Sequence, residues 1–205
     1  MLGANGKVSA PYIITACDEV SGALFARNRW RETFTDRVAF LDMRGQQSSC
    51  SGDRLAFLGL HGDVGRPRAL ADDTPLPGRV GAGLDPCGAL RTRVELDVDA
   101  EVELLVLLGD AESAEAAREL IETYRHADLG ASLDDARAQW DDALRDLQVR
   151  TPDRGMDIML NGWLLYQALA CRVWARTAYY QASGAYGFRD QLQDVMALCL
   201  SRTDV

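Results

Sequence analysis

The pattern of apolar and polar positions changes near residue 110. Before that point, short runs rich in β-branched and aromatic residues predict strands, with a turn signal at residues 18–22 and a loop region rich in proline and glycine at 62–88. Apolar and polar residues alternate from Val94 onward, as in a half-buried strand, and the run that follows is more apolar. The predicted strands are residues 11–15, 23–26, 37–43, 90–99 and 102–109.

After Gly109 the apolar positions recur at the spacing of helices. Ser113 can cap a helix that runs through Arg125 with its apolar residues on one side, and Ser132 opens a second helix that runs to about Leu147. Pro152 marks a break. Residues 156–180 are then apolar on nearly every face, which predicts a helix inside a larger body.

The order of elements, strands first and helices afterwards, indicates segregated layers or separate domains. We place the boundary within residues 110–150. The sequence contains no internal repeat and no low-complexity tract. It therefore predicts a mixed fold, β first and then α.

Composition and charge narrow the class of protein. The 205 residues are 47% hydrophobic and 26% charged, which is typical of a folded globular protein, and the net charge of −9 argues against nucleic acid as a partner. No run approaches the roughly 20 apolar residues of a membrane span, and the first residues lack the apolar core of a signal peptide. The five cysteines are odd in number and widely spaced, so we expect reduced, structural thiols in a cytosolic setting.

Residues 184–194 carry the most unusual chemistry. Two glycines follow the apolar run, and then Arg189, Asp190, Gln193 and Asp194 gather with another glutamine in six residues. Carboxylate, amide and guanidinium groups beside aromatic rings suit the hydroxyls and faces of sugars. A plain helix start, with Asp190 in the first turn near the helix dipole, explains the same residues without a ligand.

Other candidates for chemistry are weaker. His61 and His126 lack the spacing of metal ligands, so we expect no metal site. The glycines of residues 78–83 are not followed by a predicted helix, so a phosphate-binding loop is not expected. Trp163 and Trp174 share one helix face, where core packing is favoured over sugar stacking.

The segment GAYGFRDQLQDVMAL, with NGWLLYQALACRVWARTAYYQASG before it, resembles the start of the catalytic domain in glycoside hydrolase family 94. Upstream, YIITACDEVSGALFARNRW, RVAFLDM and DPCGALRTRVELDV resemble the family's sandwich domain. The family includes cellobiose and chitobiose phosphorylases and cyclic β-1,2-glucan synthases. The chain looks most similar to the synthases.

The resemblance implies a fold and a site. It implies the end of a β-sandwich of supersandwich type at 1–110, a helical linker at 111–150 and the beginning of an (α/α)6 catalytic barrel at 151–205. Family phosphorylases invert, with inorganic phosphate as co-substrate and no organic cofactor. Asp190 matches the family aspartate that holds the sugar donating its anomeric carbon, and Arg189, Gln193 and Asp194 match the same motif as substrate-binding residues.

Two departures from the family pattern refine this picture. Gly184 stands where the disaccharide phosphorylases carry arginine, which favours the β-1,2-glucan branch. The family's general acid lies further downstream, and the similar string at 140–142 belongs to the linker helix surface. We therefore expect an incomplete piece of the enzyme, with no catalytic residue of its own and no activity alone.

The resemblance also implies partners and a location. It implies β-glucan or an oligosaccharide as ligand, no membrane segment in this chain, a homodimer or association with the missing barrel, and a cytoplasmic location for a synthase that other segments tether to the inner membrane. A non-catalytic β-sandwich that binds carbohydrate or has a structural role is the alternative.

Overall fold

A computed structural model describes residues 10–30, 32–170, 189, 192–193, 196 and 198–201. The chain forms two compact units. One ends at Ala127 and the other begins at Asp128. Each unit is described by itself.

The first unit contains a four-stranded antiparallel sheet in the order β1-β2-β3-β6. Its strands are β1 (Ile13–Cys17), β2 (Leu24–Asn28), β3 (Val38–Asp42) and β6 (Leu107–Ala111). β1 and β2 form a hairpin that pairs Ile13 with Asn28. The turn between them closes when Asp18 N–H donates to Ala23 O over 2.8 Å, with Gly22 at a φ of 72°. The first three predicted strands are confirmed, each within two residues.

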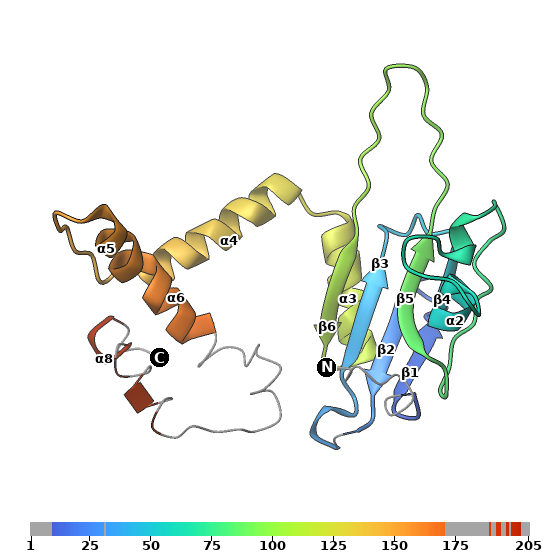
Figure 1. Cartoon of the computed structure of the whole chain (residues 1–205), viewed down its shortest axis with the longest axis horizontal. Coiled ribbons are helices and arrows are strands. Elements are labelled where there is room, and N and C mark those ends of the chain that lie inside the picture. Colours follow the sequence, from blue (N-terminus) through green and yellow to red (C-terminus); the bar gives the residue numbers. More distant parts are fainter. Residues whose placement is uncertain are drawn as a thin grey trace. The chain divides into compact units, whose positions relative to one another are not determined.

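Helix α3 (Ala114–Arg125) covers one face of this sheet (Figure 1). Ser113 caps it as predicted, because its side chain accepts a hydrogen bond from Ala116 N–H. The apolar side of the helix joins the sheet in one core, made by Ala23, Phe25, Val38, Phe40, Ala111, Ala114, Ala117 and Ile121. The sequence placed this helix in the linker at 111–150. In the structure, the buried residues of α3 complete the core of the sheet.

A second sheet pairs β4 (Ser49–Asp53) with β5 (Pro86–Arg91). It packs on the face of the first sheet that α3 does not cover, since a Cβ added at Gly88 would meet Leu24 and Leu41. Asp53 caps the short helix α2 (Arg54–Leu58) through Leu55 N–H. The loop region predicted at 62–88 is confirmed except for the short helix η2 (Arg68–Leu70) and the start of β5; η1 (Glu32–Phe34) lies between β2 and β3.

A disulfide joins the two sheets. Cys17 on β1 and Cys50 on β4 are bonded, whereas Cys87 on β5 is a free thiol. The expectation of reduced thiols is therefore wrong for this pair. The pairing spans 33 residues and depends on how the two sheets face each other, which spacing along the sequence does not reveal.

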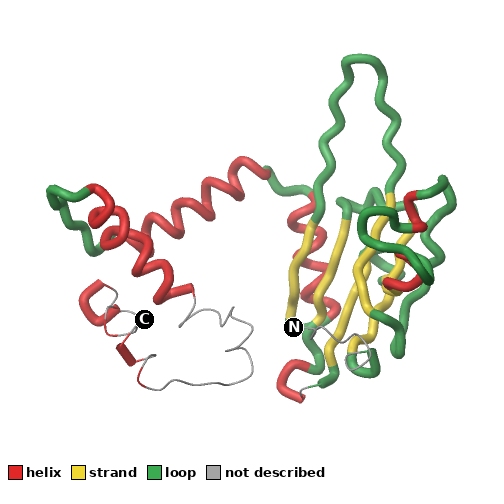
Figure 2. Tube along the Cα trace, viewed as in Figure 1, coloured by secondary structure: helices red, strands yellow, loops and turns green. Residues whose placement is uncertain are grey.

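Residues 92–106, here named the arm, run as two extended limbs joined by a turn between β5 and β6 (Figure 2). The prediction of a half-buried strand at 90–99 is wrong, because the alternating apolar residues of the arm face solvent and no described strand pairs with them. Among these residues Val98 is 93% exposed and Leu96 is 63% exposed. The strand predicted at 102–109 begins only at Leu107.

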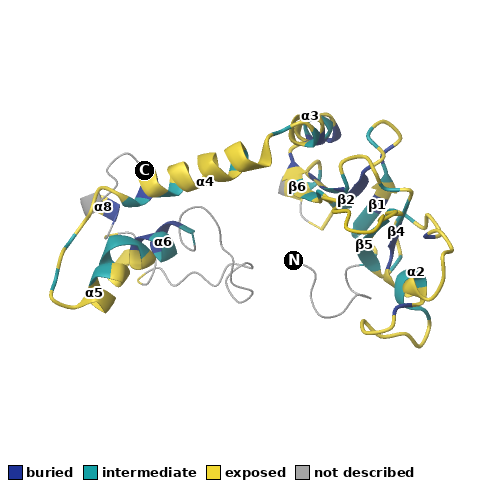
Figure 3. Ribbon diagram, turned by 90° about the horizontal axis from the view of Figure 1, so that it is seen from above, coloured by how far each residue is buried: buried dark blue, intermediate teal, exposed yellow. Residues whose placement is uncertain are grey.

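The second unit is helical in its described part. Helix α4 (Leu129–Leu144) is capped by Asp128, four residues before Ser132, which was predicted to open it, and it is largely exposed (Figure 3). Then follow α5 (Arg154–Ile158), the π-helix η3 (Met159–Trp163), α6 (Leu164–Ala168) and α8 (Leu198–Ser201). Their small core contains Ala143, Leu165, Ala168, Leu169 and Leu198. The helix predicted at 156–180 is confirmed as far as residue 170; the rest lies outside the described residues.

A β part followed by helices therefore agrees with the predicted order. The (α/α)6 barrel and the boundaries at 110 and 150 otherwise stay predictions. In the part of the chain that the structure describes, none of the helices has the length and apolar character needed to cross a membrane.

Candidate functional site

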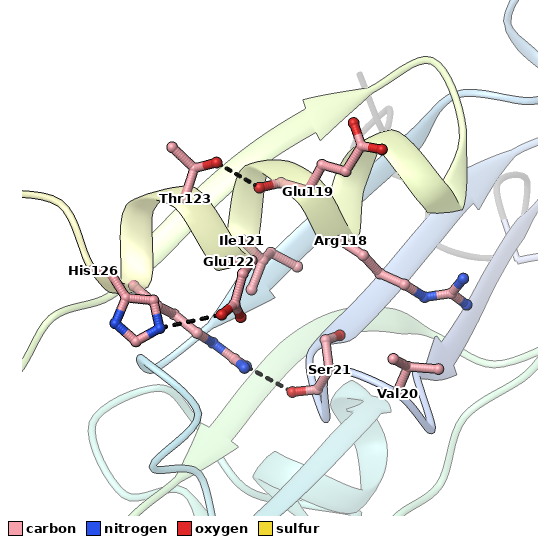
Figure 4. Close-up of a pocket in the computed structure, with 9 residues that line it drawn as sticks. Val20, Ser21, Arg118, Glu119, Ile121, Glu122, Thr123 and His126 are labelled. Atoms are coloured by element: carbon pink, nitrogen blue, oxygen red, sulfur yellow. Dashed lines mark hydrogen bonds and ion pairs between the residues drawn. The ribbon is translucent and has the colours of Figure 1, made fainter.

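The first unit has an open cavity between helix α3 and the turn at residues 18–22. It has a volume of about 550 Å3, and Val20 and Ser21 face it from the turn (Figure 4). Helix α3 contributes polar groups on the other side, among them Arg118, Glu122 and His126. His126, the C-cap residue of α3, has its Nε2 3.2 Å from Glu122 Oε1. Among the described residues, no group of three or more potential metal ligands is present.

Two arginines of α3 are held by buried carboxylates beside this cavity. Arg118 binds Asp18 with Nη2–Oδ1 at 2.7 Å and Nε at 3.1 Å from both carboxylate oxygens. Hydrogen bonding from Arg118 lowers the pKa of Asp18 to about 2, against an opposing effect of burial, and Ser21 adds to the lowering through its N–H and hydroxyl.

Asp42 and Arg125 form the second pair. Arg125 Nε and Nη2 donate to the two oxygens of Asp42 over 2.9 and 2.6 Å, and Asp42 is fully buried. Burial alone would raise the pKa of Asp42, but hydrogen bonds from Arg125, Gln47 and Gly45 outweigh it, so the pKa lies below its ordinary value. Both carboxylates thus stay ionised and engaged. They anchor the helix and are not suited to proton transfer at neutral pH.

The second unit presents stacked aromatic rings. Trp163 stacks on Tyr166 with ring centroids 5.7 Å apart, and Tyr166 lies 4.9 Å from Trp140 of α4. Trp163 is 50% exposed, so its assignment to core packing is wrong in the described structure; Trp174 lies outside the described residues. An exposed aromatic face of this kind can contact the apolar face of a sugar ring.

Polar side chains in the second unit hold the segment between α4 and α5. Asn161 of η3 accepts a hydrogen bond from Val149 N–H over 2.6 Å and donates to Val149 O over 2.8 Å. Asp157 accepts from Thr151 N–H over 2.7 Å, and Asp153 caps α5. These carboxylates therefore serve the local fold.

The structure describes only two of the four predicted substrate-binding residues. Arg189 and Gln193 have helical backbones and are exposed. Asp190 and Asp194 lie outside the described residues. The sugar site built from these four residues stays a prediction.

Within the string at 140–142, the two aspartates lie on the surface of helix α4 as expected, whereas Trp140 is half-buried and packs against the core of the second unit. Asp141 and Asp142 are both exposed, and Asp142 pairs with Arg145 over 2.9 Å on the same helix. This surface pair is worth less than about 1 kcal/mol and does not resemble a buried general acid.

Comparison with known families identifies both units. The family model described as "Glycosyl hydrolase 94, supersandwich domain" matches residues 1–127, and "Glycosyl hydrolase 94 superfamily, catalytic domain" matches residues 139–204. The chain belongs to glycosyl hydrolase family 94. The resemblance read from the sequence motifs is therefore confirmed.

Relatives within family 94 include synthases and phosphorylases. The chain is 38% identical over 202 residues, 98% of its length, to 7% of the cyclic beta-(1,2)-glucan synthase NdvB of Rhizobium meliloti (strain 1021). It is 32% identical over 73% of its length to 19% of the N,N'-diacetylchitobiose phosphorylase of Vibrio furnissii, and 34% identical over 71% to 18% of the solabiose phosphorylase of Paenibacillus borealis. The chain thus spans less than a fifth of each of these family 94 relatives.

The structure of this family 94 chain also reveals residues that sequence reasoning missed. The two buried carboxylate–arginine pairs join residues about a hundred and about eighty positions apart, and no local pattern marks them. Asn161 had a weak signal, since an amide inside an apolar helix needs a hydrogen-bond partner. The bonds to Val149 supply that partner.

Proposed function

We propose that this chain contributes supersandwich strands and the first catalytic-domain helices to an enzyme that transfers or phosphorolyses β-glucosidic bonds. We propose that it corresponds to the phosphorylase-like region of a cyclic β-1,2-glucan synthase. The observation that carries this proposal is the 38% identity to NdvB over 98% of the chain, which runs through both structural units. A similarity confined to the sheet would have favoured a binding module.

The proposed reaction uses a β-glucan or oligosaccharide and inorganic phosphate, with no organic cofactor. In an inverting scheme, phosphate attacks the anomeric carbon from one face while a carboxylic acid protonates the leaving sugar oxygen. We also propose that the enzyme carries out this reaction in the cytoplasm.

Within that reaction, Asp190 binds hydroxyls of the sugar that donates its anomeric carbon. Carboxylate oxygens accept hydrogen bonds from hydroxyls strongly, because the acceptor is charged. Arg189 and Gln193 supply donors from the same motif, and their exposed positions leave both side chains available for a ligand. Asp194 is the fourth substrate-binding residue of the motif.

The decisive experiment uses a longer protein that carries the whole family catalytic domain. We expect Asp190→Asn to lower kcat/KM by about tenfold to over a hundredfold, since a hydrogen bond to a charged group is worth about 1.5–3 kcal/mol. The melting temperature should stay unchanged. Asp141→Asn, on the exposed surface of α4, is the matched control and should alter neither quantity. Unchanged kinetics for Asp190→Asn would refute the assignment.

Carbohydrate binding without catalysis is the second candidate, favoured by the exposed stack of Trp163 on Tyr166. Affinity electrophoresis in gels that contain β-1,2-glucan distinguishes the enzymatic role from carbohydrate binding without catalysis. Retardation of the 205-residue chain that Trp163→Ala abolishes, without any phosphate release or consumption, would support a binding module. Turnover of oligosaccharides by the isolated chain would instead contradict our expectation that it is inactive alone.

A further inference from the structure

The disulfide between the two sheets lies in a place where it can act as a switch. Cys17 ends β1 and Cys50 belongs to β4, so the bond connects the four-stranded sheet directly to the two-stranded sheet. The two strands approach closely here. A Cβ added at Gly52 would lie only 2.2 Å from Thr15 Oγ1, so glycine is what permits this approach.

Weaker contacts join the same two strands. Gly81 N–H donates to Thr15 Oγ1 over 3.1 Å, and Gly52 N–H donates to Arg79 O over 2.7 Å. The segment at residues 78–81 therefore bridges β1 and β4 by hydrogen bonds and by the ion pair of Arg79 with Asp53, whose Nη1 and Oδ2 lie 3.1 Å apart. These bonds do not depend on sulfur and remain when the disulfide is reduced, so reduction loosens the junction without removing every contact.

Small thiols can reach the disulfide. Both cysteines are partly exposed, so a small thiol in solvent can approach the pair. Cys87 competes poorly for this exchange, because burial, assisted by nearby Asp53 and Asp85, raises the pKa of its thiol to about 11.

We propose that Cys17 and Cys50 form a reversible thiol–disulfide switch whose oxidised form clamps the two-stranded sheet onto the four-stranded sheet. In reduction, a thiolate of a small dithiol attacks Cys17 Sγ, the Cys17–Cys50 bond breaks and Cys50 leaves as a thiolate. The second thiolate of the dithiol then releases Cys17, and the dithiol departs as a cyclic disulfide. Oxidation takes a low-molecular-weight disulfide as electron acceptor and returns it as two thiols.

The switch also acts on the anchor of helix α3. Cys17 directly precedes Asp18, whose carboxylate binds Arg118 of that helix. When the bond to Cys50 of β4 breaks, the end of β1 can move. The disulfide and the ion pair of Asp18 with Arg118 are therefore coupled, because Cys17 and Asp18 are adjacent in the chain. Reduction should therefore raise the mobility of the turn at residues 18–22 as well as that of β4.

The first test is chemical, because the Cα atoms of the pair are 7.3 Å apart, wider than is usual for a disulfide. Mass spectrometry of peptides from the unreduced 205-residue chain should find Cys17 linked to Cys50. Thiol titration in denaturant should count three of the five cysteines before reduction and all five after it. Absence of the linked peptide would overturn the proposal.

The second test measures the clamp. A crosslink closing a loop of this length should raise the melting temperature by roughly 10 °C, so a dithiol should lower it by that amount. In Cys87→Ser the dithiol should lower the melting temperature by the same amount as in the unmodified chain. Cys17→Ser and Cys50→Ser should have the lower melting temperature from the start, and the dithiol should not change it. Hydrogen exchange at Gly52 and Gly81 should quicken on reduction and slow again in oxidised glutathione. A drop that persists in Cys17→Ser, or a failure to reverse, would refute the switch.

Discussion

Replacing Asp18 by asparagine tests whether the buried ion pair anchors helix α3. The side chain of Asp18 is 6% exposed and its two oxygens accept hydrogen bonds from Arg118 and Ser21. Asparagine has nearly the same shape but carries no charge, so the variant isolates the electrostatic contribution. We expect a clear loss of stability with the fold retained.

The magnitude follows from the shifted pKa. A carboxyl whose pKa falls from 3.8 to about 2 on folding stabilises the folded state by about 2 kcal/mol near neutral pH. Because the folded-state pKa is the lower one, this contribution is complete above about pH 4 and is lost as the pH falls toward 2. Asp18→Asn should therefore lower the melting temperature by roughly 5–10 °C at neutral pH.

Urea denaturation of both proteins between pH 2 and pH 7 is the assay, so that the pH range covers the titration of Asp18 in both the unfolded and the folded state. The difference in the free energy of unfolding should be constant near neutral pH and shrink at the acid end. Asp110→Asn is the matched control, since Asp110 pairs with Arg37 on the surface of the same unit and should cost less than about 1 kcal/mol. A loss for Asp18→Asn no larger than for Asp110→Asn, or one that does not depend on pH, would show that the pair is not an anchor.

Two further substitutions probe packing and the second unit. Gly109→Ala should destabilise the first unit by about 1–3 kcal/mol in urea denaturation, because the added Cβ would lie 2.6 Å from Phe40 Cζ in the core; Gly162→Ala, where a Cβ meets nothing within 4 Å, should show no such loss. Asn161→Ala should cost about 1–3 kcal/mol and speed proteolysis at residues 145–153, because both bonds to Val149 are lost. Equal cleavage rates would contradict that role.

The fold was predictable where the signals are local. Ser113 caps α3 because the capping bond needs only its own helix, and the hairpin of β1 and β2 follows from two strand-like runs around a turn. The alternation of apolar and polar residues from Val94 onward led to the wrong prediction of a half-buried strand. Such a pattern indicates which residues share a face, but it does not indicate whether a neighbouring strand is there to pair with them. Asp128 caps α4 because it offers its carboxylate one turn earlier than Ser132.

The candidate site was predictable only as a motif. Asp190 and its neighbours stand out because charged and amide groups crowd behind two glycines. Their mutual geometry depends on chain segments far apart, which spacing does not encode. The sequence analysis missed the disulfide of Cys17 with Cys50 for the same reason, since the pairing depends on how two sheets pack.

The arm carries its own protection against aggregation. Its extended limbs expose apolar side chains and unpaired backbone, which is a template for strand pairing between molecules. Carboxylates alternate with those side chains at Glu95, Asp97, Asp99, Glu101 and Glu103. Two arms that meet must bring these like charges together, and repulsion opposes the contact. At 0.1 M salt this repulsion is largely screened beyond a separation of about 10 Å, and the distance shortens as more salt is added. The solubility of the purified chain should therefore fall as ionic strength rises.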